Sequence, residues 1–223
     1  TPTLVDSLIP GKSLTKDIVL VIGFSLLVTV FAQIAFKLPF TTVPITGQTL
    51  AVLLAGGALG ANRGAASLFL YAIWGTIGIP VFAPSSTALQ GELIHFIFPW
   101  EGTGTAVWSI TSGGYIVGFI AAAYLVGRLA ERHWDRGWNI TIAMLAGNAL
   151  VYLFGLAWLG FAIGTGFLNE SLGFDLASVI PGNSTLDKTL VGGLYPFIVG
   201  DLIKLYIASS ALPGAWALIG RQR

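Results

Sequence analysis

The chain has 223 residues, of which only 9% are charged, and its formal net charge is +1. Soluble domains carry about 25% charged residues, whereas 55% of this chain is apolar. This composition excludes a water-soluble domain, a disordered segment and a nucleic-acid-binding protein, because no basic patch can be assembled. Cysteine is absent, which excludes disulfides, thiolate metal sites and cysteine nucleophiles. An integral membrane protein remains.

Six apolar stretches predict the fold. A helix needs about 20 mostly apolar residues to cross the hydrocarbon layer. In chain order, the stretches cover residues 17–36, 45–60, 64–79, 106–129, 138–163 and 192–212. Pro44 suits the start of the short second stretch, and Pro213 with Gly214 ends the sixth. We therefore predict one all-α membrane domain over residues 1–223, with six transmembrane helices.

The first stretch is longer than the apolar region of a signal peptide, so we expect it to be retained. Small residues four apart, at Gly56/Gly60, Gly114/Gly118 and Gly160/Gly164, have the spacing of closely packed membrane helices.

The basic residues predict the orientation, because Lys and Arg are enriched in loops on the cytoplasmic side. With both termini inside, the outer segments carry only Lys37 and Lys188. The inner segments carry Lys12, Lys16, Arg63, Arg128, Arg132, Arg136, Arg221 and Arg223. We therefore predict that the N-terminus and the C-terminus both face the inside. Within the external loop over residues 80–105, the aromatic-rich run 93–100 is too short to span and predicts an interfacial segment.

Several kinds of chemistry are unsupported. Gly11-Lys12-Ser13 resembles the end of a P-loop, but Asp6 occupies the position of the required first glycine. There is neither a Gly-x-Ser-x-Gly elbow nor a His-Glu-x-x-His motif. The two histidines, His95 and His133, lie in dissimilar surroundings. We therefore expect no nucleotide site of this type, no metal and no cofactor.

Asp201 and Lys204 are the ionisable residues that lie firmly inside a predicted span. Charges within a membrane are costly and by default mark a functional site. At a spacing of three residues they share one helix face. Two interpretations remain open: an ion pair that locks the sixth helix, or a site in which Lys204 neutralises an acid and Asp201 accepts N–H donors.

The segment over residues 39–49 is the second feature. Two prolines bracket hydroxyl residues and lead into a helix start. It is either a stiff connector or an external lid over a pocket. Aromatic residues could line such a pocket, although aromatics in membrane spans more often serve packing. The candidates are Tyr71, Trp74, Tyr115, Tyr152 and Trp158.

A family resemblance supports the second alternative in each case. Residues 32–34 and 38–50 read AQI and LPFTTVPITGQTL, which resembles the first external loop of the BioY family. Residues 53–56, 59–60, 63–64 and 78–83 continue the resemblance. SGGYIVGF at residues 112–119 is similar to the start of the family's fourth helix, and GDLIK at residues 200–204 to its sixth. The blocks occur in the family's order across nearly the whole chain.

BioY proteins are biotin-binding S components of energy-coupling factor (ECF) transporters. The resemblance implies a biotin pocket near the outer face, under the loop over residues 37–48. It places Asp201 and Lys204 at the family's Asp-x-x-Lys positions, which contact the vitamin. Residues 64–127 contain no Lys or Arg, so we expect Lys204 to meet the acid and Asp201 to meet the ureido group. The full predicted set is Asp201, Lys204, Gln48, Thr42, Tyr115 and Tyr152.

The resemblance also implies partners and a location. The partners are biotin, membrane lipid, a transmembrane T component and two ABC-type ATPases, and the location is the inner (plasma) membrane of a prokaryote. Ser25 and Thr29 on the first helix form a small-xxx-small pair that we predict to dock the partner complex.

Three alternatives remain, the first within transport and the other two from other classes of function. The chain could serve another small vitamin, either as an S component or as a solitary transporter. It could be an intramembrane enzyme using Asp201 as a general acid or base, but a second carboxylate or a histidine in register is missing. It could also be a structural scaffold. We predict a non-enzymatic biotin-capture subunit.

Overall fold

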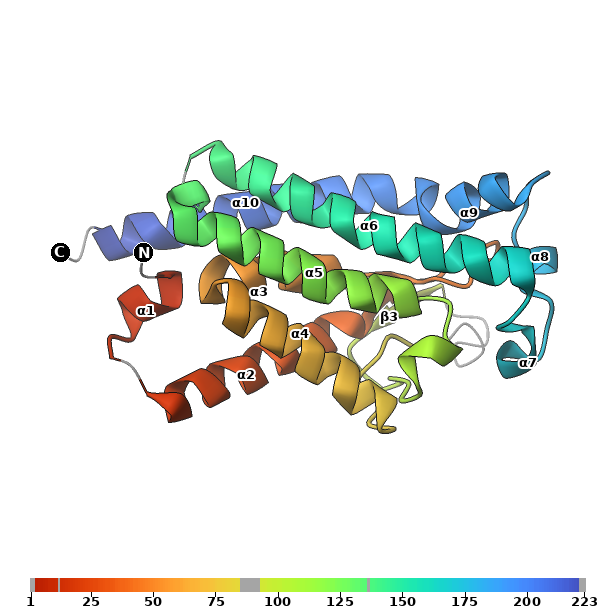
Figure 1. Ribbon diagram of the computed structural model, residues 1–223, viewed down its shortest axis with the longest axis horizontal. Coiled ribbons are helices and arrows are strands. Elements are labelled where there is room, and N and C mark those ends of the chain that lie inside the picture. The colour runs from red at the N-terminus through yellow and green to blue at the C-terminus, as the bar shows by residue number, and fades with distance from the viewer. Residues whose placement is uncertain (1–2, 12, 85–92, 136, 221–223) are drawn as a thin grey trace.

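The structure is a computed structural model that describes residues 3–11, 13–84, 93–135 and 137–220. Its described part is dominated by six long helices (Figure 1). They are α2 (Leu14–Ala32), α3 (Gln48–Leu59), α4 (Ala61–Thr76), α5 (Gly113–Leu129), α6 (Asn139–Thr165) and α10 (Ile198–Gly220). Each overlaps one of the six predicted stretches. Helices α5, α6 and α10 run along the longest axis, and α2 and α4 cross it obliquely.

Four described helical segments are long and apolar enough to cross a membrane. They are Leu14–Ala32, Gly113–Trp134, Asn139–Thr165 and Thr185–Leu218. Helix α3 is apolar but has only 12 residues, so at 1.5 Å per residue it is about 18 Å long. Helix α4 has 16 residues. A mostly helical fold with four candidate membrane spans is thus confirmed, whereas the number of six spans stays a prediction.

The last helix differs from the prediction at both ends. The helix predicted over residues 192–212 is split into α9 (Thr185–Gly193), the 3₁₀ turn η3 (Tyr195–Phe197) and α10. Helix α10 continues through Pro213 to Gly220, so the predicted helix end at this proline is wrong. Proline is tolerated in membrane helices because neighbouring groups satisfy the freed backbone carbonyl. The span predicted from residue 106 likewise begins with a 3₁₀ turn, η1 (Val107–Ser109), ahead of α5.

Glycines allow the helices to approach closely. A Cβ atom on Gly114 of α5 would lie 2.2 Å from the Cβ of Trp158 on α6. A Cβ on Gly56 of α3 would lie 2.6 Å from the carbonyl oxygen of Ala123 on α5. The predicted packing role of these small residues is therefore confirmed at both positions. Gly60 has a φ of 84°, which favours glycine, and it joins α3 to α4 without a longer loop.

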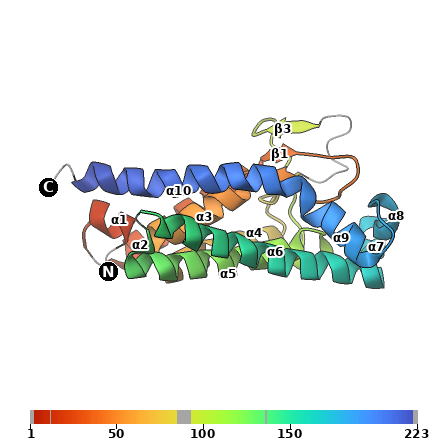
Figure 2. The same cartoon turned by 90° about the horizontal axis from the view of Figure 1, so that it is seen from above.

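The short helix α1 (Leu4–Leu8) and the C-terminal end of α10 lie at the same end of the bundle (Figure 2). This arrangement agrees with both termini being on one side of the membrane, although the side itself stays a prediction. Four of the basic residues used for that prediction lie outside the described residues, namely Lys12, Arg136, Arg221 and Arg223. The π-helical turn η2 (Ala130–Trp134) follows α5 at this end.

An ionic cluster ties α1 to the bundle at this end. Arg63 of α4 donates to both carboxylate oxygens of Asp6, at 2.9 and 2.5 Å, and to Asp17 at 3.1 Å. Lys16 pairs with Asp6 at 2.9 Å. The hydrogen bonds from Arg63 are the largest influence on Asp6, and they hold the pKa of its carboxyl far below the ordinary range against the opposing effect of burial.

A small antiparallel sheet lies toward the other end of the bundle, at which α7 (Asn169–Leu172) and α8 (Leu176–Val179) also lie. Its strands are β1 (Ile34–Phe36), β2 (Ile45–Thr46) and β3 (Ile94–Phe96), in the order β2-β1-β3. Ala35 is opposite both Thr46 and His95. The all-α prediction is wrong here, because strands of two or three residues have no readable period.

Strand β3 belongs to the run predicted to be interfacial. Its neighbours Leu93 and Phe98 are exposed, as is Phe96 within it. Part of the run 93–100 therefore forms a strand paired with β1. The position of the run at the membrane surface stays a prediction.

Candidate functional site

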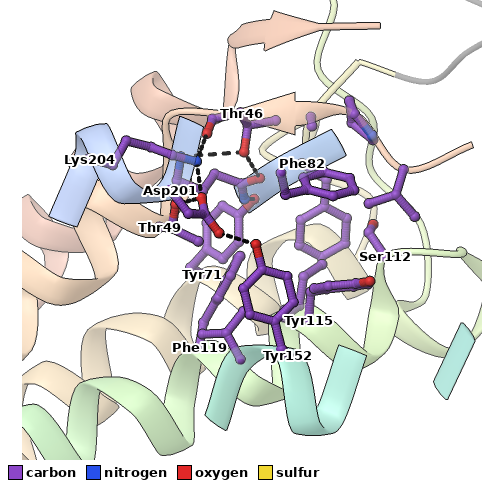
Figure 3. A pocket seen from close by; sticks show the side chains of 17 residues that line it. Thr46, Thr49, Tyr71, Phe82, Ser112, Tyr115, Phe119, Tyr152, Asp201 and Lys204 are labelled. Carbon is purple, nitrogen blue, oxygen red and sulfur yellow. Dashed lines mark hydrogen bonds and ion pairs between the residues drawn. The ribbon is translucent and has the colours of Figure 1, made fainter. Parts of the chain in front are cut away.

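A cavity of about 50 Å³ lies where the sheet meets the helices (Figure 3). The loop between β1 and β2 contributes to its wall together with α3, α4, α5, α6 and α10. Its apolar lining includes Val43, Phe82, Phe119, Val151 and Phe197, and its polar lining includes Thr46, Gln48, Thr49, Tyr152, Asp201 and Lys204. Such a division suits a ligand with one polar end and an apolar body.

The β1–β2 loop is fixed from two sides. The Thr41 hydroxyl donates to the carbonyl oxygen of Gly192 at 2.5 Å. The Thr111 hydroxyl donates to the carbonyl oxygen of Thr42 at 3.3 Å. Strand β2 ends at Thr46 and α3 begins at Gln48, so the hairpin delivers both polar side chains to the cavity wall.

Asp201 and Lys204 form an ion pair at the edge of the cavity (Figure 3). Their side chains are 6% and 13% exposed, respectively. The Lys204 ammonium also donates to the carbonyl oxygen of Thr46 at 2.9 Å. The two charges therefore neutralise each other in a place where either one alone would cost several kcal/mol.

Further donors converge on Asp201. Its Oδ1 accepts from the Thr49 hydroxyl at 3.1 Å, and its Oδ2 accepts from the Tyr152 hydroxyl. The Asn148 amide also approaches Oδ2, at 3.5 Å. Three elements, α3, α6 and α10, are thus connected through this one carboxylate.

A second series of hydrogen bonds runs through the cavity wall. The Thr46 hydroxyl donates to Gln48 Oε1 at 2.8 Å, and Gln48 Nε2 donates to the Tyr71 hydroxyl at 2.6 Å. Tyr71 is 0% exposed and packs edge-to-face against Phe82, with ring centroids 5.3 Å apart. These hydrogen bonds hold the Gln48 amide in place at the start of α3.

The structure brings five of the six predicted binding residues to this cavity: Asp201, Lys204, Gln48, Tyr115 and Tyr152. The Tyr115 hydroxyl is bonded to the carbonyl oxygen of Gly193 at 2.8 Å, so its ring is what remains for a ligand. Thr42 is not in the lining of this cavity. It lines a neighbouring cavity of about 80 Å³, which shares Pro44, Phe82, Ala83 and Ser112 with the first.

Several lining residues were not predicted. Tyr71 appeared only among five undifferentiated aromatics, of which Trp158 instead donates to the carbonyl oxygen of Ile110 at 3.0 Å. Thr46 and Thr49 lie within the recognised loop motif but had no assigned role. Asn148, which contacts Asp201 without lining this cavity, was not predicted either. Its signal in the sequence is an amide in the middle of a long apolar run, because such a group needs a partner. Within the described residues, no group of three or more His, Cys, Asp or Glu side chains could hold a metal ion.

The predicted docking pair is buried. Ser25 is 0% and Thr29 is 4% exposed. Their hydroxyls donate to the carbonyl oxygens of Ile22 and Ser25, at 2.7 and 2.9 Å. We therefore correct the docking prediction for these two residues, because in this arrangement both face the bundle interior. The exposed side of α2 carries larger residues instead, namely Ile18, Val19, Ile22, Leu26 and Val30.

Comparison with known proteins shows the family to which this chain belongs. The sequence model of the BioY family matches residues 5–221. The chain belongs to the BioY family. The resemblance read from the loop and helix motifs is thereby confirmed, and so is the expectation that the protein is a transporter component rather than an enzyme.

Individual relatives agree with this assignment. The chain is 30% identical over 215 residues to the biotin transporter BioY of Rhizobium etli, covering 92% of this chain and 95% of the relative. It is 31% identical over 189 residues to a probable biotin transporter BioY of Pyrococcus horikoshii, covering 85% and 89%. Its fold is similar to the crystal structure of the S-component for biotin from an ECF-type ABC transporter. That match has a TM-score of 0.64 at 21% identity and covers 91% of this chain and 93% of the other.

Proposed function

We propose that this BioY-family protein captures biotin in the cavity beside Asp201 and Lys204 and serves as the S component of an ECF transporter. The observation that carries the proposal is the buried ion pair at the edge of an apolar, aromatic-lined cavity, in a chain of this family. Biotin has a polar ureido ring, an apolar thioether ring and an apolar chain that ends in an acid. A few polar groups set into an apolar pocket suit such a molecule.

The ion pair constrains how biotin can lie. The ureido group and the acid are at opposite ends of an elongated molecule, whereas the charged groups of Asp201 and Lys204 touch. From the sequence we expected Asp201 to meet the ureido group and Lys204 to meet the acid. An extended ligand cannot place one end on each of two residues whose charged groups touch. The pair is neutral overall and offers a donor beside an acceptor, which matches the neutral C=O and N–H groups of the ureido ring. We assign both residues to that ring.

The acid would then point toward the neighbouring cavity of about 80 Å³. Thr42, Thr111 and Ser112 supply hydroxyls to its lining. Among the described residues, the Thr42 hydroxyl is buried without a hydrogen-bond partner. Helix α5 begins directly after Ser112, and the N-terminal end of a helix favours negative charge.

Uptake requires partners in this proposal. The chain lacks a complete P-loop, so ATP hydrolysis would be supplied by two ABC-type ATPases acting through a transmembrane T component. The complex would lie in the inner (plasma) membrane of a prokaryote, with both termini of this chain inside and the β1–β2 loop outside. A release step would have to loosen the contacts of Thr41 and Thr111 that fix the loop.

Titration calorimetry tests the binding proposal directly. The purified full-length protein in detergent micelles is titrated with biotin, with thiamine and riboflavin as controls. Saturable one-site binding of biotin alone is expected. Binding of thiamine or riboflavin in place of biotin would refute the assignment. Uptake of labelled biotin in cells with and without the T component and ATPases then tests the requirement for partners.

A further inference from the structure

The carboxylate of Asp201 is already saturated with hydrogen bonds. Its Oδ1 is contacted by the Lys204 ammonium and the Thr49 hydroxyl, and its Oδ2 by the Tyr152 hydroxyl and the Asn148 amide. An ionised carboxylate offers about four lone-pair positions. A ureido N–H that binds Asp201 must therefore displace one of these donors.

Tyr152 is the donor with an alternative acceptor close by. Asn148 lies one turn before it on α6, and side chains four apart on a helix are neighbours. Asn148 is 8% exposed, and its Oδ1 is buried without a hydrogen-bond partner among the described residues. Its Nδ2 faces the carboxylate, so the opposite amide orientation would place two acceptors against each other.

There is also space for the hydroxyl to move. A cavity of about 240 Å³ on the side of α6 and α10 is lined by Asn148, Tyr152 and Asp201 together with Leu145, Ala149, Ile198 and Leu202. Tyr152 and Asp201 line the ligand cavity as well. These two residues therefore line both cavities, and a shift of the Tyr152 hydroxyl toward Asn148 leads to the side of the second cavity, which Asn148 also lines.

We propose that Tyr152 is a two-position donor and that Asn148 is the positioning residue that makes its second position possible. When a biotin N–H reaches Oδ2 of Asp201, the Tyr152 hydroxyl transfers its hydrogen bond to Oδ1 of Asn148. No buried polar group then loses its partner, and the orphan acceptor on Asn148 gains one. This inference rests on the proposed function and adds the specific means by which a saturated carboxylate admits the ligand.

A double-mutant cycle on biotin affinity tests it. In the parent protein, Asn148→Leu should weaken binding about tenfold. Asn148 does not line the ligand cavity, and a leucine of similar size fills the place of its amide, so the ligand and the Tyr152 hydroxyl cannot use the vacated position on Asp201 and the displaced hydroxyl is left unpaired. In the Tyr152→Phe background there is no hydroxyl to accommodate, and Asn148→Leu should change the affinity less than about threefold. The loss of the Asn148 amide donor is common to both backgrounds and cancels in the cycle. Leu153→Ala, on the exposed side of α6, is the matched control and should be neutral in both backgrounds.

The outcomes separate the two proposals. Equal losses in both backgrounds would show a purely structural role for Asn148 and overturn this inference while leaving biotin binding intact. An unchanged affinity of Asn148→Leu in the parent would overturn it too. Failure of the parent protein to bind biotin would overturn the proposed function and this inference with it. Asn148→Val, whose smaller side chain cannot overfill the site but still covers the place of the amide, enters the same cycle if the leucine variant does not fold.

Discussion

Replacing Lys204 with methionine separates the two interpretations of the ion pair. The substitution keeps the length of the side chain and removes its charge, so Asp201, with a side chain 6% exposed, is left as an uncompensated anion. Removing one partner of a buried pair costs about 3–5 kcal/mol. The donors Thr49, Tyr152 and Asn148 remain on the carboxylate. We therefore expect the lower value, about 3 kcal/mol, and a melting temperature lower by roughly 10 °C.

The neutral double variant Asp201→Asn/Lys204→Met should recover most of this stability, because no unpaired charge remains. It should still fail to bind biotin if the pair recognises the ureido ring. Melting temperature and titration calorimetry on the parent, both single variants and the double variant measure the two effects separately. Lys188→Met is the matched control, since it removes a lysine that donates to the carbonyl oxygen of Ala177 and lies before the predicted sixth stretch, 192–212. Its effect on stability should stay below about 1 kcal/mol.

Two results would refute this reasoning. A Lys204→Met variant as stable as the parent would show that the carboxylate is not a buried anion that depends on lysine. A double variant that regains stability and also binds biotin normally would show that the pair only locks the structure.

The analogue biotinamide, which lacks the acid, tests the orientation of the ligand. If Lys204 meets the ureido ring, the substitution should weaken biotin and biotinamide by the same factor.

The remaining predictions concern packing, pH and the second cavity. Gly114→Ala should destabilise the protein by about 1–3 kcal/mol in thermal melts, because its Cβ would lie 2.2 Å from a tryptophan of α6. Gly23→Ala, which meets nothing within 4 Å, should not destabilise it. The Arg63 hydrogen bond is the largest cause of the lowered pKa of Asp6. The ionised Asp6 carboxylate therefore stabilises the folded protein above about pH 4, and this stability is lost as the pH falls toward the lowered pKa. The deficit of Asp6→Asn in melting temperature should therefore shrink on acidification, and a constant deficit would contradict the assignment. Thr42→Val should weaken biotin about fivefold but leave biotinamide unchanged.

The helices and the ion pair could be predicted from sequence because each carries a signal in one dimension. An apolar run long enough to span a bilayer is visible without knowledge of its neighbours. The same holds for Asp201 and Lys204, because an ionisable residue inside such a run stands out. Helix ends were less predictable: Pro213 normally ends a helix in water, but α10 continues past it.

The contacts between distant segments were not predictable in this way. Strand β3 pairs with β1 from a position about sixty residues later in the chain, and each strand has only three residues. The burial of Ser25 and Thr29 depends on which side of α2 faces the bundle. Beyond the charged residues of its first turn, that helix is apolar on nearly all sides, so its sequence has no clear polar face to reveal the orientation. The family motif located the β1–β2 loop, but only the structure shows that Thr42 faces a different cavity from Gln48.

The saturation of Asp201 explains why its charge is compatible with a membrane interior, and under the proposed function it also limits which ligands can bind there. Four protein donors stabilise the carboxylate, so a ligand gains little by offering one more N–H unless a donor can leave without becoming unpaired. Lys204 is held by its charge, and Thr49 lies on the short helix that begins beside the cavity. Among the other three donors, Tyr152 lies one helical turn from Asn148, whose Oδ1 lacks a hydrogen-bond partner among the described residues. Selectivity at this site would then depend on a ligand that supplies an N–H to Asp201 and a carbonyl to Lys204 together, as a cyclic urea does.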